Sequence, residues 1–173
     1  LDTFLDEVTV DPQGNVYTTG SFSETTDFDP GSEVFNLTSA GNFDIYVTKQ
    51  NPQGDLMWAF RLGGVNAESA RAIASDPLGN VYIAGTFPDP VDFDPGSGNT
   101  TLPGPGGYVC KFDTDGNFLW AAQISNNLTG PWSLVIDSDN NVCVASAFTG
   151  TTDFDPGAGV SNFTSAGSAD IFV

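Results

Sequence analysis

The chain has 173 residues, of which 22 are acidic and four are basic, and it contains no histidine; its formal net charge is −18 at pH 7. This balance excludes nucleic-acid binding, which needs clustered lysine and arginine, and it disfavours docking on anionic membranes. The lack of histidine also excludes imidazole-based catalysis and histidine-ligated zinc sites.

Three motifs recur in the same order along the chain. The segment 11–17 returns at 76–82 and, with changes, at 137–143; Asp-Phe-Asp-Pro-Gly begins at residues 27, 92 and 153; and 51–58 matches 113–120. A fixed period of about 62 residues indicates a repeat architecture. We place the units at 1–65, 66–126 and 127–173. Because the chain begins at Leu1, we expect it to be part of a longer, processed protein.

Each complete unit predicts four short strands, and the second unit shows them best. We expect strands at 71–75, 81–87, 108–112 and 118–124, with tight turns at 76–80 and 113–117 and a long connection at 88–106. The strand at 81–87 is apolar on both faces and contains Ala84 and Gly85, which suits a strand between two neighbouring sheets. Glycine, proline and aspartate abound, and no window has a sustained helical period, so we expect no helix.

Four antiparallel strands per unit indicate a blade of a β-propeller. The predicted fold class is all-β: a β-propeller fragment of four-stranded antiparallel blades, with two complete blades and a partial third. A β-solenoid is the alternative, but its units are shorter than these. A closed propeller needs about four to eight blades. The expected partners are therefore further blades of the parent chain, or other chains, that complete the ring.

The ordered motifs resemble the SBBP-type bacterial β-propeller repeats. The shared features are Asp-x-x-Gly-Asn-Val-Tyr, Asp-Phe-Asp-Pro-Gly, Asp-Ile-Tyr/Phe-Val and Leu-x-Trp, which cover nearly the whole chain. The Asp-Phe-Asp-Pro-Gly form is similar to repeats in large secreted or surface proteins of Bacteroidetes. The resemblance implies export from the cell and a role in adhesion or surface structure. The third unit departs from the pattern at Asn140 and Cys143.

The Asp-Phe-Asp-Pro-Gly segments are the candidate metal site. In an extended segment both aspartates share one face and the phenylalanine points to the other. Two neighbouring carboxylates need compensation, which either backbone N–H groups or Ca²⁺ would supply. The first alternative is a structural turn with a phenylalanine plug. The second makes Ca²⁺ ligands of Asp27, Asp29, Asp92, Asp94, Asp153 and Asp155.

Aspartates in the tight turns favour a structural role. Asp11, Asp76, Asp113 and Asp137 each start a short turn, where an Asx side chain caps backbone N–H groups. Asn51 replaces Asp113 in the matching turn, which a metal ligand would not tolerate. In an up-and-down blade these turns share one face. The long segments 23–43, 88–106 and 149–168 are expected on the opposite face, as a binding surface.

The remaining candidate side chains are cysteines and tryptophans. Cys110 and Cys143 lie in apolar strands and are predicted to be small buried residues rather than a disulfide framework. Trp58 and Trp120 occupy matching strand positions and are predicted to pack in the core. Trp132 follows Gly130-Pro131 at a link between units and is more open to a surface role.

No catalytic constellation is present, because the paired carboxylates repeat in every unit whereas catalysis needs one distinctive site. We therefore expect a non-enzymatic module, secreted or on the bacterial cell surface, for structural or adhesive interactions with a surface protein or glycan. It binds no nucleic acid and inserts in no membrane. The alternatives are a Ca²⁺-dependent ligand-binding propeller, an enzyme that hydrolyses polysaccharide, and export-system cargo or a plug captured with a partner complex.

Overall fold

The structure is a computed structural model that describes residues 2–126, 128–155, 157 and 159–173, without the side chains of 128–132. The described residues form strands and turns, which confirms the all-β prediction. None of them lies in a helix that is long and apolar enough to cross a membrane.

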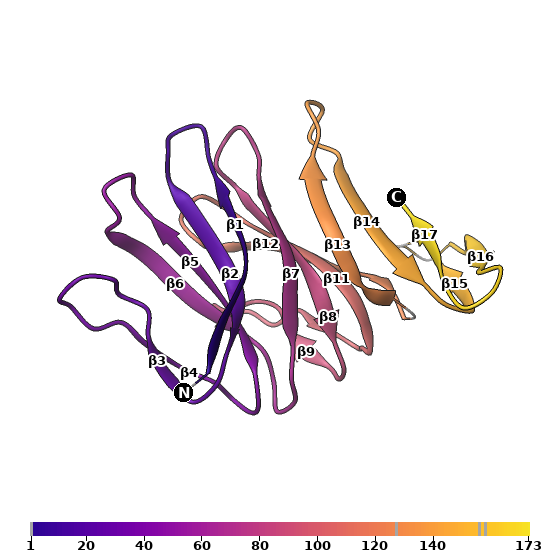
Figure 1. Ribbon diagram of the computed structural model, residues 1–173, viewed down its shortest axis with the longest axis horizontal. Helices are drawn as coiled ribbons and strands as arrows, with labels where there is room; N and C mark the ends of the chain where they lie inside the picture. The colour runs from indigo at the N-terminus through magenta and orange to yellow at the C-terminus, as the bar shows by residue number, and fades with distance from the viewer. Residues whose placement is uncertain (1, 127, 156, 158) are drawn as a thin grey trace.

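Three antiparallel sheets follow one another along the chain (Figure 1). The first pairs β1 (Thr3–Val10), β2 (Val16–Phe22), β5 (Asp44–Gln50) and β6 (Leu56–Leu62) in that order. The second pairs β7 (Ser69–Ser75), β8 (Val81–Phe87), β11 (Gly106–Phe112) and β12 (Phe118–Ser125). The third contains β13 (Leu128–Ile136), β14 (Val142–Phe148) and β17 (Asp170–Phe172). These are two four-stranded propeller blades and a three-stranded third.

The long connection of each blade contains a small hairpin that the sequence did not predict. Each hairpin joins the second strand of its blade to the third. The pairs are β3 (Thr25–Asp27) with β4 (Asn36–Thr38), β9 (Val91–Asp92) with β10 (Thr101–Leu102), and β15 (Thr151–Asp153) with β16 (Asn162–Thr164). The Asp-Phe-Asp-Pro-Gly segment starts at the end of the first strand of each pair.

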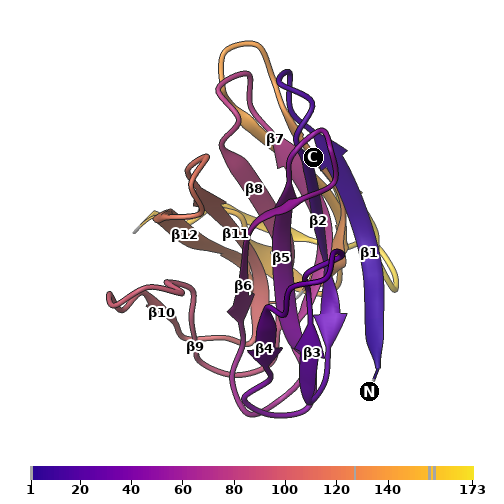
Figure 2. The ribbon, with the colours of Figure 1, turned by 90° about the vertical axis from the view of Figure 1, so that its left-hand side faces the viewer.

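The sheets are stacked face to face, as Figures 1 and 2 show. One apolar cluster joins the first two blades and includes Val81, Ile83 and Phe87 of β8. The intervening side chains, Tyr82 and Ala84, belong to a second cluster with Leu134 of the third blade. The central strand β8 therefore buries side chains on both faces, as its sequence predicted.

Two predicted strands of the second blade begin earlier than expected. β7 begins at residue 69 rather than 71, because the chain continues to pair with β8 across a bulge between Ala70 and Ala72. β11 begins at residue 106 rather than 108, since Gly106 and Gly107 pair with Phe87 and Thr86. Glycine weakens a strand on its own. Here the ladder of the neighbouring strand overrides that preference.

Close backbone packing explains the glycine in the middle of β8. Gly85 is paired with Tyr108, and a Cβ at Gly85 would lie 1.9 Å from the Ser69 carbonyl oxygen and 2.8 Å from a ring carbon of Tyr108. Gly20 has the same relation to Tyr46 in the first blade. Absence of a side chain lets the bulged strand and the aromatic ring approach the backbone.

We expect Gly85→Ala to lower the free energy of unfolding by about 1–3 kcal/mol, because the methyl group overpacks a rigid core. For a chain of this size that corresponds to a fall in melting temperature of about 2–4 °C per kcal/mol. Thermal unfolding measures it. Gly64→Ala is the control, since the nearest atom to a Cβ there is 3.7 Å away. Equal melting of the two variants would contradict the packing argument.

Candidate functional site

The first aspartate of each Asp-Phe-Asp-Pro-Gly segment closes its hairpin through backbone hydrogen bonds. Asp27 Oδ1 accepts the N–H groups of Asp29, at 3.0 Å, and Phe35, at 2.8 Å. Asp92 Oδ1 accepts those of Asp94 and Thr100 at 3.1 and 2.7 Å. The same pair of bonds forms in the third blade. There Asp153 Oδ1 accepts from Ser161, at 2.7 Å, and from Asp155, at 3.1 Å.

The second aspartate of each segment caps the Pro-Gly turn. Its Oδ1 accepts the glycine N–H two residues on, at 2.6 Å for Asp29, 2.8 Å for Asp94 and 2.7 Å for Asp155. Charge-assisted bonds of this kind stabilise the ionised form. The N–H groups of Ser161 and Asp155 accordingly lower the pKa of Asp153. Backbone donors therefore supply the compensation that the paired carboxylates require.

The phenylalanine of the segment packs on its own blade. The ring of Phe93 is fully buried, with its centroid 5.3 Å from Phe87 and 4.5 Å from Tyr108. Phe28 lies 5.2 Å from Phe22 and 4.7 Å from Tyr46. In the third blade the same three positions hold Phe148, Phe154 and Phe172. The plug expected from the alternation therefore forms a triad of rings in each blade.

The tight turns share one Asx geometry. Asp76 Oδ1 accepts the N–H groups of Leu78 and Asn80, both at 3.0 Å, and its Oδ2 accepts the side-chain amide of Asn80 at 2.7 Å. Corresponding bonds occur at Asp11, Asp113 and Asp137. At Asn51 the backbone bonds to Oδ1 are the same, and only the bond between side chains is reversed, because Asn51 Nδ2 donates to Asp55 Oδ2. These aspartates hold turns, as predicted.

Among the described residues, each hairpin brings two carboxylates together rather than a complete set of calcium ligands. Ca²⁺ takes six to eight oxygen ligands. Each segment brings two carboxylates, and one oxygen of each already accepts N–H groups. In the described part of the chain, no three or more acidic, cysteine or histidine side chains form a group that could hold a metal ion. Calcium binding at Asp27, Asp29, Asp92, Asp94, Asp153 and Asp155 stays a prediction.

The hairpins lie beside hollows along the outer strands rather than on one flat face. Asp29–Glu33 and the turn 53–56 line a hollow of about 570 Å³. Asp94–Gly98, the turn 115–118 and residues 58–60 of the preceding blade line one of about 480 Å³. The long loops and the turns between strands three and four, expected on opposite faces, thus contribute to common hollows. The reason is that, in the two complete blades, the connection folds into a hairpin that contacts the outer strand: β4 contacts β6, and β10 contacts β12.

One polar hollow differs from the others. It measures about 370 Å³ and lies between the end of β12 and the third hairpin, where Asp153, Asp155 and Asn162 line it. Gln123 and Thr152 also line this hollow. Their buried oxygens, Gln123 Oε1 and Thr152 Oγ1, have no hydrogen-bond partner in the described structure. No sequence pattern marked Gln123 or Thr152, because the hollow exists only where two blades meet.

The tryptophans have different environments. The ring of Trp58 stacks on Phe60 at 5.3 Å, and a Cβ on Gly116 of the next blade would lie 3.2 Å from it. Trp58 is half-buried and packs against the first apolar cluster, in line with the packing role predicted for it. Trp120 is 37% exposed, contrary to the core position predicted for it, and its ring meets that of Tyr82 edge-on. The side chain of Trp132 lies outside the described residues.

The cysteines are free. Cys110 is buried in the first apolar cluster, and burial raises the pKa of its thiol. Cys143 is half-buried. The structure thus assigns Cys110 a packing role and joins neither residue in a disulfide.

Comparison with known proteins supports the blade architecture. The chain is 27% identical, over 154 residues, to the uncharacterized WD repeat-containing protein L264 of Acanthamoeba polyphaga mimivirus, which covers 82% of the chain. It is 31% identical over 108 residues, or 60% of the chain, to the regulatory protein FlaEY of Caulobacter vibrioides. The aligned region is 11% of the length of each relative. No family model matches the chain. The chain is thus distantly similar to a WD repeat-containing protein.

Replacement of Asp92 tests the hydrogen bonds of the hairpin. We expect Asp92→Ala to lower the free energy of unfolding by about 1–2 kcal/mol, since two N–H groups lose their acceptor. Asp92→Asn keeps that acceptor and is expected to cost less. Chemical denaturation of both variants measures the difference. Equal losses would show that the negative charge, rather than the acceptor geometry, matters.

Chelation tests the calcium hypothesis. We expect the melting temperature of the chain to be the same in EDTA and in added Ca²⁺, because backbone donors already compensate the carboxylates. Differential scanning calorimetry in both solutions gives the answer. A rise in melting temperature with Ca²⁺ that Asp92→Asn abolishes would contradict this expectation.

Proposed function

We propose that the chain is a non-enzymatic module of a secreted or cell-surface bacterial protein, with a structural or adhesive role. One observation carries the proposal: the three hairpins use the same hydrogen bonds at the same aspartates in every blade. An active site breaks such symmetry, because one acid must differ from its neighbour in environment. A repeated, polar and acidic surface suits structural contacts or many weak contacts at once.

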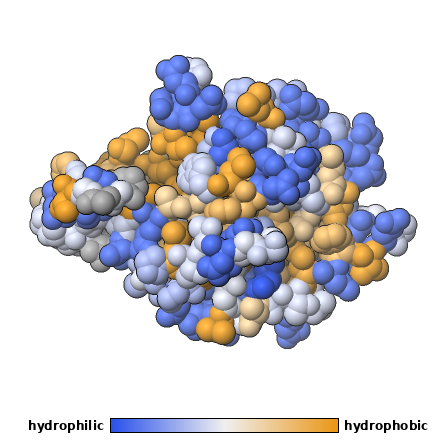
Figure 3. All heavy atoms as spheres, turned by 180° about the vertical axis from the view of Figure 1, so that it is seen from behind, coloured by the Kyte–Doolittle hydropathy of each residue, from blue (hydrophilic) through white to orange (hydrophobic). Residues whose placement is uncertain are grey.

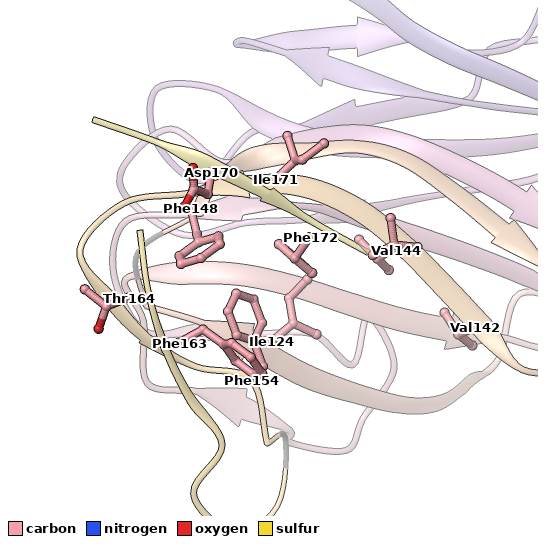
Figure 4. A pocket seen from close by; sticks show the side chains of 11 residues that line it. Ile124, Val142, Val144, Phe148, Phe154, Phe163, Thr164, Asp170, Ile171 and Phe172 are labelled. Atoms are coloured by element: carbon pink, nitrogen blue, oxygen red, sulfur yellow. The ribbon is translucent and has the colours of Figure 1, made fainter. Parts of the chain in front are cut away.

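Exposed apolar surface supports a role within a larger assembly. A hollow of about 730 Å³ opens on the third blade, where Phe148, Phe154 and Phe172 point toward one another (Figure 4). On the first blade, Phe4, Leu5, Val8 and Val10 of β1 are each more than half exposed. Figure 3 shows apolar side chains among polar ones across one face of the molecule. Large apolar patches mark interaction surfaces. We propose that further blades cover these two ends.

The family proposal follows from the motifs. We assign the chain to the SBBP-type repeats in their Asp-Phe-Asp-Pro-Gly form, as in surface proteins of Bacteroidetes. The hairpin that contains this motif supports the proposal, since the motif builds the same capped turn and ring triad in each blade. Extracellular placement and export rest on that resemblance.

A ligand-binding propeller is the second candidate, and the polar hollow of the third blade favours it. Two buried oxygens without partners, on Gln123 and Thr152, line it together with carboxylates of the third hairpin. Such atoms are usually satisfied in native proteins. A calcium-dependent glycan or protein ligand belongs to this candidate, which the chelation experiment addresses.

Surface labelling tests the proposed function. We expect antibodies against the 173-residue chain to label intact cells of the source bacterium, and external protease to remove the label. Cells that lack the gene are the control. Labelling only after permeabilisation would refute a surface role. Retention in a complex with the export machinery would instead support the cargo alternative.

A further inference from the structure

Two acidic side chains are buried together where the first blade meets the second. Asp44, at the start of β5, is fully buried, and Glu68, just before β7, is 2% exposed. Their carboxyl groups approach each other at Gly63: a Cβ there would lie 2.6 Å from Glu68 Oε2 and 2.7 Å from Asp44 Cγ. Two ionised carboxylates repel strongly at such a position, because little water screens them.

One oxygen of each carboxyl group has partners and the other has none. Asp44 Oδ2 accepts the N–H of Ala40 at 2.8 Å and pairs with the guanidinium of Arg61. Glu68 Oε2 accepts the N–H of Gly64 at 2.9 Å. Asp44 Oδ1 and Glu68 Oε1 are buried and have no hydrogen-bond partner in the described structure. Native proteins rarely leave buried acceptors unpaired.

We propose that Glu68 and Asp44 hold one proton between them in the folded chain. The proton supplies the missing donor and needs no space of its own. It also leaves the pair with a single negative charge, which matches the single positive charge of Arg61 on β6. A metal ion fits less well, because the pair offers two carboxylates with a cation already alongside.

The surroundings of Glu68 favour its protonated form. Burial raises the pKa of its carboxyl, and the charge of Asp44 raises it further, against the opposing effects of the Gly64 N–H and Arg61. From the second blade, Tyr108 of β11 faces the same region, and burial, with a smaller effect of the charge of Asp6 on β1, raises the pKa of its hydroxyl. Tyr108 therefore stays neutral and contributes no charge.

The proton makes the joint between the two blades sensitive to pH. The backbone N–H of Glu68 donates to the Phe43 carbonyl at 2.9 Å, so this residue ties the linker to the first blade. Because the pKa of Glu68 is raised on folding, the stabilisation is complete below the ordinary pKa of glutamate, 4.5, and is lost as the pH rises through the raised value. Loss of the proton adds repulsion at the joint.

Carboxyl ¹³C NMR of the intact 173-residue chain tests the proposal without mutation. We expect the Glu68 δ-carboxyl to titrate above pH 4.5, the ordinary value for glutamate. In Asp44→Asn the Glu68 midpoint should fall, since a neighbouring charge is removed. Titration of wild-type Glu68 at or below pH 4.5 would overturn the shared proton.

Glu68→Gln provides an independent test by stability. The amide keeps an acceptor for Gly64 and adds a permanent donor for Asp44. Above pH 4.5 we expect the unfolding constant of the wild type to rise relative to that of Glu68→Gln, by up to about tenfold per pH unit for one proton. Glu33→Gln, at an exposed position, is the matched control and should follow the wild type. Identical pH profiles for the two variants would overturn the proposal.

Discussion

Burial of both faces of each sheet is the constraint on which the structure depends. A strand such as β8 directs Val81, Ile83 and Phe87 to one neighbour and Tyr82 and Ala84 to the other. A single sheet of this composition would expose two apolar faces to water. The stacking of blades covers them, and it fixes where every hairpin, joint and hollow can lie. The exposed residues of β1 and the open hollow of the third blade are the two places where this burial ends.

The four basic residues cannot balance 22 acidic ones, so the backbone takes over much of that task. Both lysines are used internally: Lys49 lies 5.2 Å from the ring of Tyr17, and Lys111 lies 4.7 Å from the ring of Tyr82. Lys111 also pairs with Asp76 of a tight turn, with its Nζ 3.5 Å from Asp76 Oδ2, but hairpin aspartates such as Asp92 and the turn aspartate Asp113 accept N–H groups instead. Such bonds stabilise a carboxylate without any counterion. A protein can thus carry a charge of −18 while many of its carboxylates act as structural acceptors.

The sequence predicted what repeats within one unit and missed what arises between units. Alternation and turn residues located the strand at 81–87 to the residue and the phenylalanine plug at Phe93. The sequence did not predict the hairpins, because strands as short as β9 and β10, with two residues each, leave little alternation in the sequence. The sequence did not predict the buried pair of Asp44 and Glu68 for another reason. They are 24 positions apart and belong to different repeats, so only the stacking of blades brings them together.

The two complete blades differ at two equivalent positions together: the first blade has a charged pair where the second has an uncharged pair. Arg61 is the cross-strand partner of Tyr46, and Gln123 is the partner of Tyr108 at the same place in the second blade. Asp44, opposite Phe22, corresponds to Gly106, opposite Phe87. A Cβ at Gly106 would lie 2.3 Å from the Ser125 carbonyl oxygen and 2.6 Å from Gln123 Nε2, so the backbone of β12 excludes an aspartate here and Gln123 fills the space beside the glycine. The ionic pair of the first blade is therefore replaced as a unit. A lone aspartate opposite Gln123, or a lone Arg61 opposite glycine, would leave one buried charge without its partner, which is the costlier arrangement.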